Sequence, residues 1–135
     1  LPDGDLDPMH HTPQSSQRAR AIDAWAALRT LGRSGLAELV DRCSDHARRF
    51  AEGLRAAGAE VLNDVVINQV LVGFRDDATT DRVIEHIQNS GECWCGGTMW
   101  KGRKAMRISV SSWATTAEDV ERSLAAMIAA VRAGG

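Results

Sequence analysis

The residues of this 135-residue chain best suited to chemistry lie in the segment 92–116. Arg107 stands there among small hydroxyl residues, on a segment whose alternation places Met106, Ile108 and Val110 on the opposite face of a strand. A guanidinium on a strand face, next to a glycine-rich segment, can receive an anion. The alternatives are an ordinary solvated sheet face, or a strand arginine that pairs with a nearby acid.

The cysteines are the second candidate group, because alternation places Cys93 and Cys95 on one face of a strand. A metal site needs more ligands, and Cys43 and His46, one helical turn apart, are the available partners. Small apolar cysteines packed in a core are the favoured interpretation, so we predict no metal. Three cysteines, an odd number, make no disulfide framework and favour a reducing cytoplasm.

The elements around these residues follow from periodicity. A hairpin turning near Lys101 and Gly102 precedes a helix over 117–132, which Thr115 or Thr116 caps. Upstream, Gly32 ends one helix, and a second helix starts at Ser34. The pattern then predicts strands over 59–62 and 67–74, and a helix capped by Thr79 or Thr80. This order predicts an α+β fold: a small, mostly antiparallel sheet with helices on one face, preceded by two helices.

The composition is that of a single globular domain, with 44% hydrophobic and 25% charged residues. A net charge of -2 gives no basic surface for nucleic acid or an anionic membrane, and no apolar run is long enough to cross a bilayer. The opening segment resembles no targeting peptide and lacks an initiator methionine, which predicts a trimmed or processed chain. We divide the chain into an extended connector (1–16), a linking helix (17–33) and an α+β domain (34–135).

Four colinear segments resemble the C-terminal end of group II pyridoxal-phosphate-dependent amino-acid decarboxylases of fold-type I, in the aspartate-aminotransferase-like superfamily. They are DPMHHTP, the helical segment SQRARAIDAWAALRTLGRSGLAELVDRCSDHARRFAEGL, the strand pair VLNDVVINQVLVGF, and CWCGGTMWKGR with MRISVSSWATTAEDVERS. The resemblance extends over nearly the whole chain. It implies a C-terminal small domain separated from a much larger enzyme, a carboxy-lyase that removes the α-carboxylate of an amino acid.

In that family a preceding large domain carries the cofactor lysine in a Ser-x-His-Lys setting. This chain has only Lys101 and Lys104, both at the hairpin turn, and His10-His11 is followed by Thr12. The resemblance therefore implies that pyridoxal phosphate belongs to the intact parent enzyme, and that no cofactor binds this chain and no catalytic residue lies in it. We expect the chain to be inactive alone. Its expected partners are the missing pyridoxal-phosphate-binding domain and a second copy in a homodimer, with no nucleic acid or membrane.

The resemblance also implies roles for individual residues. In related aminotransferases an arginine at the position of Arg107 pairs with the substrate carboxylate, which makes Arg107 the substrate-carboxylate candidate. The connector of the intact family passes near the active site, so His10 and His11 are secondary candidates. Arg18 and Arg20, near the start of the first helix, are secondary candidates as anion-binding residues. Solvated side chains or ion pairs are the alternative for all four.

Two other functions fit the sequence. One is a free-standing binding or dimerisation module with a ferredoxin-like sheet, compatible with the element order after Ala59. The other is the tail of a fold-type I aminotransferase or desulfurase. Trp94, Trp100 and Trp113 gather around the hairpin, an aromatic enrichment that indicates an interface with the missing domain or a second copy.

Overall fold

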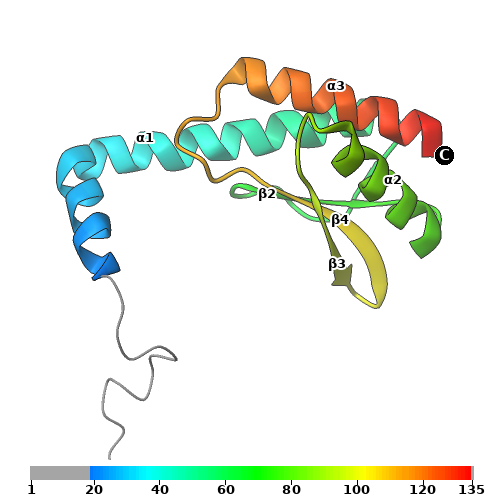
Figure 1. The fold of residues 1–135 in the computed structure, drawn as a ribbon, viewed down its shortest axis with the longest axis horizontal. Helices are drawn as coiled ribbons and strands as arrows, with labels where there is room; N and C mark the ends of the chain where they lie inside the picture. The colour runs from blue at the N-terminus through cyan, green and yellow to red at the C-terminus, as the bar shows by residue number, and fades with distance from the viewer. Residues whose placement is uncertain (1–18, 135) are drawn as a thin grey trace, which may run out of the picture. The chain divides into compact units, whose positions relative to one another are not determined.

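A four-stranded antiparallel sheet forms the centre of the computed structural model, which describes residues 19–134 (Figure 1). The strands are β1 (Glu60–Val61), β2 (Gln69–Gly73), β3 (Gly96–Trp100) and β4 (Arg103–Ser109), in the order β1-β2-β4-β3. The α+β class and the antiparallel sheet predicted from the sequence are confirmed.

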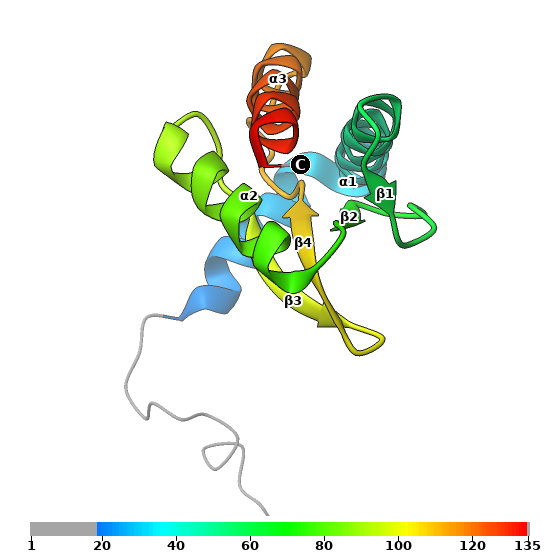
Figure 2. The same cartoon turned by 90° about the vertical axis from the view of Figure 1, so that its right-hand side faces the viewer.

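Between residues 19 and 134 the structure also describes three helices: α1 (Arg20–Ala56), α2 (Asp77–Ser90) and α3 (Ala117–Gly134). The second half of α1 packs with α2 and α3 over one face of the sheet, as the sequence predicts (Figure 2). Alternation on the strands and 3.6-residue periodicity on the helices direct apolar side chains into a single core. Its fully buried side chains include Leu54, Val70, Val72, Val83, Ile87, Met106, Val120 and Met127.

The described part of the chain divides into two units, 19–36 and 37–134. The helix α1 continues across this boundary, but its backbone leaves the helical conformation at Gly32, with φ 62° and ψ -171°. The predicted helix break at Gly32 is therefore confirmed. Within the first unit, the Arg29 guanidinium lies over the Trp25 ring at 5.8 Å.

Two of the strands are shorter than the sequence predicts, because the Asn63 side chain takes the place of a pairing strand. Its Oδ1 accepts a hydrogen bond from the Leu71 backbone N–H at 2.8 Å, and its Nδ2 donates to the Gln69 carbonyl at 3.1 Å. The strand β1 consequently ends at Val61, and β2 begins at Gln69 rather than at Ile67. A side-chain amide that satisfies backbone groups in this way replaces the ladder of a longer strand pair.

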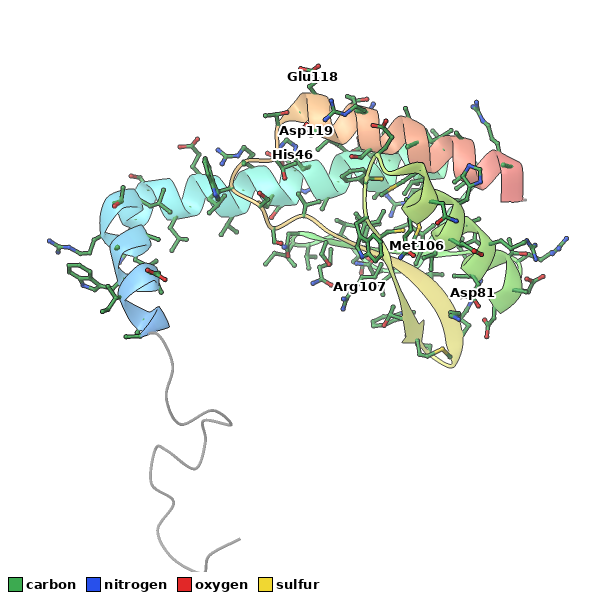
Figure 3. The ribbon with its side chains drawn as sticks, in the orientation of Figure 1. His46, Asp81, Met106, Arg107, Glu118 and Asp119 are labelled. Atoms are coloured by element: carbon green, nitrogen blue, oxygen red, sulfur yellow. The ribbon has the colours of Figure 1, made fainter. Side chains whose placement is uncertain are left out.

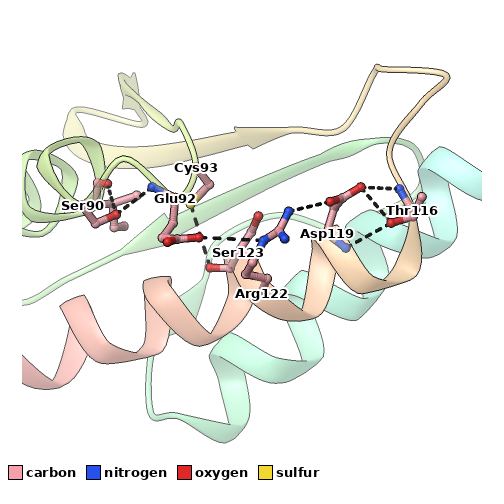
Figure 4. Close-up of polar contacts among 8 residues, drawn as sticks. Ser90, Glu92, Cys93, Thr116, Asp119, Arg122 and Ser123 are labelled. Carbon is pink, nitrogen blue, oxygen red and sulfur yellow. Dashed lines mark hydrogen bonds and ion pairs between the residues drawn. The ribbon is translucent and has the colours of Figure 1, made fainter.

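The hairpin and the cap of the last helix agree with the predictions. Lys101 and Gly102 both have positive φ, 49° and 81°, which is the backbone of a tight two-residue hairpin turn. Thr116 caps α3 in a reciprocal pair: its hydroxyl accepts from the Asp119 N–H at 3.2 Å, and the Asp119 carboxylate accepts from the Thr116 N–H at 3.0 Å (Figure 4). These bonds lower the pKa of Asp119.

The predicted cap of α2, Thr79 or Thr80, is wrong. Asp76 occupies the N-cap with extended backbone, and its carboxylate accepts from the Thr79 N–H at 2.7 Å. Both threonines lie inside the first turn and are buried, and the Thr80 hydroxyl donates back to the Asp76 carbonyl at 3.0 Å. A carboxylate also complements the positive end of the helix, so Asp76 is the better cap.

This cap predicts a specific loss of stability in acid. The Thr79 backbone N–H, followed by the Thr79 hydroxyl and Arg75, lowers the pKa of Asp76 from 3.8 to about 2. A depressed folded-state pKa stabilises the fold above the unfolded pKa, and that stabilisation is lost as the pH falls from about 4 towards 2. Asp76→Asn keeps a cap acceptor but does not titrate. The free energies of unfolding of the unmodified protein and of Asp76→Asn, measured with urea, should therefore converge as the pH falls through this window. A difference that stays constant with pH would contradict the assignment.

Candidate functional site

Arg107 lies on the face of the sheet that the helices leave uncovered. On β4 it alternates with the buried Met106 and Ile108, and Figure 3 shows its side chain directed away from the helices. Its side chain is exposed, and it makes no ion pair or hydrogen bond with any residue between 19 and 134. One alternative expected from the sequence, pairing with a nearby acid, is therefore not realised in the described part of the chain. The other alternative, a solvated sheet face, fits the exposed side chain.

The neighbours of Arg107 on this face leave it accessible. Leu71 on β2 and Gly96 on β3 lie opposite it in the two strand pairs, and Ser109 follows on the same face of β4. A Cβ placed on Gly96 would meet no atom within 4 Å, so the space beside the guanidinium is open. An exposed guanidinium without a partner can bind a carboxylate through two parallel hydrogen bonds.

The other cations of the hairpin are engaged. The Arg103 guanidinium pairs with the Glu60 carboxylate at 3.1 Å and donates to the Phe74 carbonyl at 2.8 Å, which holds β4 to the edge at β1. Arg103 therefore has a structural partner on each side, in contrast to Arg107.

The two lysines are similarly placed for structure. The Lys104 Nζ lies 2.6 Å from the Asp81 carboxylate, and its backbone N–H donates to Asp77 at 3.0 Å, which fastens β4 to α2. The Lys101 ammonium lies over the Trp100 ring at 5.8 Å. A lysine that forms a Schiff base must present a neutral amine in a desolvated pocket. An ammonium paired with a carboxylate and one stacked at an exposed turn do not fit that requirement, so these residues do not fit a pyridoxal phosphate site.

The cysteines lie before the strand rather than on it, because β3 begins at Gly96. The placement of Cys93 and Cys95 on a strand is therefore wrong, although their predicted burial in the core is right for Cys95, at 2% exposed. Cys93 is half-buried, and its thiol lies 3.9 Å from the Ser123 carbonyl (Figure 4). It borders a cavity of about 240 Å³, which is also lined by Trp94, Ile108, Ser111, Thr115 and Met127.

Burial makes the thiols poor nucleophiles and poor metal ligands. It raises the pKa of Cys93, although the contact with Ser123 opposes the shift, and it raises the pKa of Cys95 to about 12. Metal binding and nucleophilic attack both require the thiolate. Cys43 is buried, and the Nε2 of His46 is buried without a hydrogen-bond partner among the described residues. No three His, Cys, Asp or Glu side chains between residues 19 and 134 come together as a metal site.

A thiol-labelling experiment checks this account. In the folded protein at pH 8, we expect iodoacetamide to modify Cys95 about a thousandfold more slowly than a thiol of ordinary pKa, because the thiolate population falls tenfold for each pKa unit. Peptide mass mapping gives the rates for Cys93 and Cys95 separately, and labelling in denaturant provides the reference. Equal rates for Cys95 in folded and unfolded protein would contradict its burial.

The structure describes only one of the four secondary site candidates. His10, His11 and Arg18 lie outside the described residues, and Arg20 is the first residue of α1. None of the helices described between residues 19 and 134 combines the length and the apolarity needed to cross a membrane.

Several large apolar side chains of the second unit are exposed. Trp94 and Trp113 are 75% and 78% exposed, and Val66, in the loop before β2, is 82% exposed. The sequence predicts an interface at the tryptophans, whereas the exposed Val66 was not among the predicted residues. A pattern in the sequence could have indicated this exposed residue. Two adjacent apolar β-branched residues, Val65 and Val66, follow a turn and precede the polar Asn68.

Known proteins resemble the chain over most of its length. The histidine decarboxylase of Drosophila melanogaster is 28% identical over 118 residues, which are 85% of this chain and 14% of that protein. The Oryza sativa TDC solved with PLP and tryptamine aligns with a TM-score of 0.78 at 19% identity, over 90% of this chain and 28% of the other. The Catharanthus roseus tryptophan decarboxylase solved with L-tryptophan aligns with a TM-score of 0.78 at 17% identity. The alignment covers 100% of this chain and 31% of the other. No family model matches the sequence.

The chain is thus a partial match to group II pyridoxal-phosphate-dependent decarboxylases, as the sequence indicated. Its three helices and four-stranded antiparallel sheet correspond to the C-terminal portion of their structures. It spans about a seventh of the curated relative and about 30% of the two solved chains. The remaining part of each relative has no counterpart in these 135 residues.

Proposed function

We propose that this chain is the C-terminal part of a pyridoxal-phosphate-dependent enzyme that removes the α-carboxylate of an amino acid. One observation carries the proposal: the likeness runs along 85–100% of this chain in sequence and in fold, while it accounts for less than a third of each relative. In this proposal residues 1–16 are the connector from the missing large domain, 17–33 are the linking helix, and 34–135 are the small domain.

Under this proposal the isolated chain has no decarboxylase activity. Pyridoxal phosphate supplies the electron sink of such reactions when a protein holds it through a lysine. The only lysines of this chain are Lys101 and Lys104, and their contacts to Trp100 and Asp81 serve the hairpin. Cofactor binding therefore belongs to the missing domain, and this chain contributes surface that excludes water and orients the substrate.

Arg107 is the proposed contact to the substrate. Its guanidinium is exposed and has no partner among residues 19–134, so its charge is available to a carboxylate. A carboxylate held in a strong ion pair is stabilised in the ground state, which opposes its departure as carbon dioxide. We therefore assign Arg107 to initial binding and orientation of the substrate. A strong pair that persists through the reaction would favour the aminotransferase alternative instead. His10, His11, Arg18 and Arg20 remain secondary candidates.

The proposed partners are the missing large domain and a second copy of the parent enzyme in a homodimer, in the cytoplasm. The exposed Trp94 and Trp113 side chains support an interface, because large aromatic side chains are enriched where proteins meet. The free thiols of Cys43, Cys93 and Cys95 are consistent with a reducing compartment.

The mass of the native polypeptide tests the proposal. An antibody raised against residues 37–135 should detect, in cells that encode this sequence, a polypeptide about three or more times longer, since the solved relatives are that much longer than the matched part. The captured protein should release carbon dioxide from an amino acid in the presence of pyridoxal phosphate. A native product of 14.6 kDa that binds a small ligand by itself would favour the ferredoxin-like module.

A further inference from the structure

The cavity of about 240 Å³ beside Cys93 lies between the end of β4, the segment before β3, and the helices α1 and α3. All of its lining residues belong to the range 37–134, so the second unit forms it alone. Its lining includes the exposed residues Trp94, Ser109, Ser111 and Ser112, so the cavity opens to solvent on their side. Arg107 does not line it.

The inner wall of the cavity is apolar and rich in rings and sulfur. The buried Phe50, Ile108 and Met127 line it, and the half-buried Cys93 lies beside them. Aromatic rings and sulfur atoms both make favourable contacts with an aromatic ring, beyond the gain from burying its surface. This wall therefore suits an aromatic ring better than an aliphatic group of the same size.

Hydroxyl groups make up the polar part of the lining. Four of them form no hydrogen bond with any residue between 19 and 134; they belong to Ser109, Ser111, Thr115 and Ser123. None of the lining residues in that range carries a charge. A hydroxyl both donates and accepts, so it can satisfy a neutral polar group. A charged ligand would lose hydration here without gaining a partner of opposite charge.

The volume fits a ligand with a single ring. An apolar protein cavity of about 150 Å³ holds benzene, whereas sites for drug-sized ligands measure about 300–1,000 Å³. The cavity in this chain lies between these sizes. It therefore has room for one ring and a small substituent.

We propose that this cavity binds a small, neutral aromatic ligand that carries a hydroxyl group, of which phenol is the simplest. The ring packs against Phe50, Ile108 and Met127. The ligand's hydroxyl exchanges hydrogen bonds with Thr115 and Ser123, which are half-buried and so compete less with water than the exposed serines do. The inference uses the second unit alone and does not depend on the function proposed above.

Titration of the full chain with phenol, followed by NMR of the methyl groups, tests the proposal. The signals of Ile108, Val110 and Met127 should shift, with a dissociation constant on the order of 1 mM, as suits so small a ligand. Cyclohexanol has the same hydroxyl on a ring that is not aromatic, so it should bind about threefold more weakly or less well still. Benzoate is charged and should leave these three signals unmoved.

Variants on the lining locate the ligand. Ser123→Leu puts an apolar side chain into the cavity and should raise the dissociation constant for phenol about tenfold or more. Ala125→Leu is the matched control, because it adds the same side chain to α3 at an exposed position outside the cavity, and it should leave binding unchanged. Thr115→Val keeps the shape and removes one hydroxyl, so it should weaken binding about threefold. Far-UV circular dichroism checks that each variant keeps the fold.

Four results would overturn the proposal. They are an unmodified chain whose three methyl signals do not respond to phenol up to its solubility, an equal response to benzoate, unchanged phenol binding in Ser123→Leu, and unchanged phenol binding in Thr115→Val.

Discussion

Met106→Ala should lower the free energy of unfolding by about 2–5 kcal/mol, the usual cost of removing a large side chain from a closed core. Met106 has no exposed surface and lies on β4, between Val72 on β2 and Gly97 on β3. The three helices cover this face, so the cavity left by the side chain cannot be filled by water. Urea unfolding followed by circular dichroism measures the change.

The adjacent residue provides the control for this prediction. Arg107 is on the opposite face of the same strand, is exposed, and has no described partner, so Arg107→Ala should change stability by no more than about 0.5 kcal/mol. The contrast tests the assignment of the two faces of β4. A larger loss for Arg107→Ala than for Met106→Ala would mean that the helices cover the other face.

Gly53→Ala should destabilise the protein by about 1–3 kcal/mol, as overpacking does, although alanine favours a helix over glycine by about 1 kcal/mol. A Cβ on Gly53 would lie 2.9 Å from Cδ1 and 3.1 Å from Cγ of Leu124, and closer still to Cδ2. Leu124 is buried on α3, so it has little room to move. The glycine therefore permits the close approach of α1 and α3.

A double-mutant cycle isolates this contact. In a Leu124→Ala background the methyl groups that oppose Gly53→Ala are gone, so the same substitution should become neutral or stabilising. The thermal or urea midpoints of the four proteins give the coupling energy. Additive effects would show that the close approach at Gly53 does not determine the packing of these helices.

The parts of the fold set by local rules could be predicted from the sequence. Alternation assigned Met106 and Ile108 to the core, the positive-φ turn was located at Gly102, and Thr116 was identified among the capping candidates. These features depend on neighbours a few residues apart. The prediction of the α2 cap failed because Asp76 and two threonines, all favourable capping residues, lie within one turn. Capping propensity alone does not decide which of them occupies the N-cap.

The features that depend on distant residues could not be predicted. The Asn63 side chain ends β1 because it reaches Leu71, and the chain must fold before that contact exists. The Arg49 guanidinium binds the Glu121 carboxylate at 2.5 and 2.7 Å, which joins α1 to α3 across 72 residues. For the same reason, Arg107 could be identified from the sequence by its type and position, but its lack of a described partner could not. That lack depends on the ion pairs that Glu60 of β1 makes with Arg103 and Asp81 of α2 makes with Lys104.

The most direct test of the account is the reaction of the purified chain with pyridoxal phosphate, followed by borohydride reduction and intact mass. The matched control is the Lys101→Arg, Lys104→Arg variant, which keeps both positive charges and has no lysine. A domain without a cofactor site should show no saturable visible absorbance and no more adduct than this variant. A stoichiometric, saturable adduct on Lys101 or Lys104, absent from the variant, would show that the chain builds its own cofactor site, and would contradict the account.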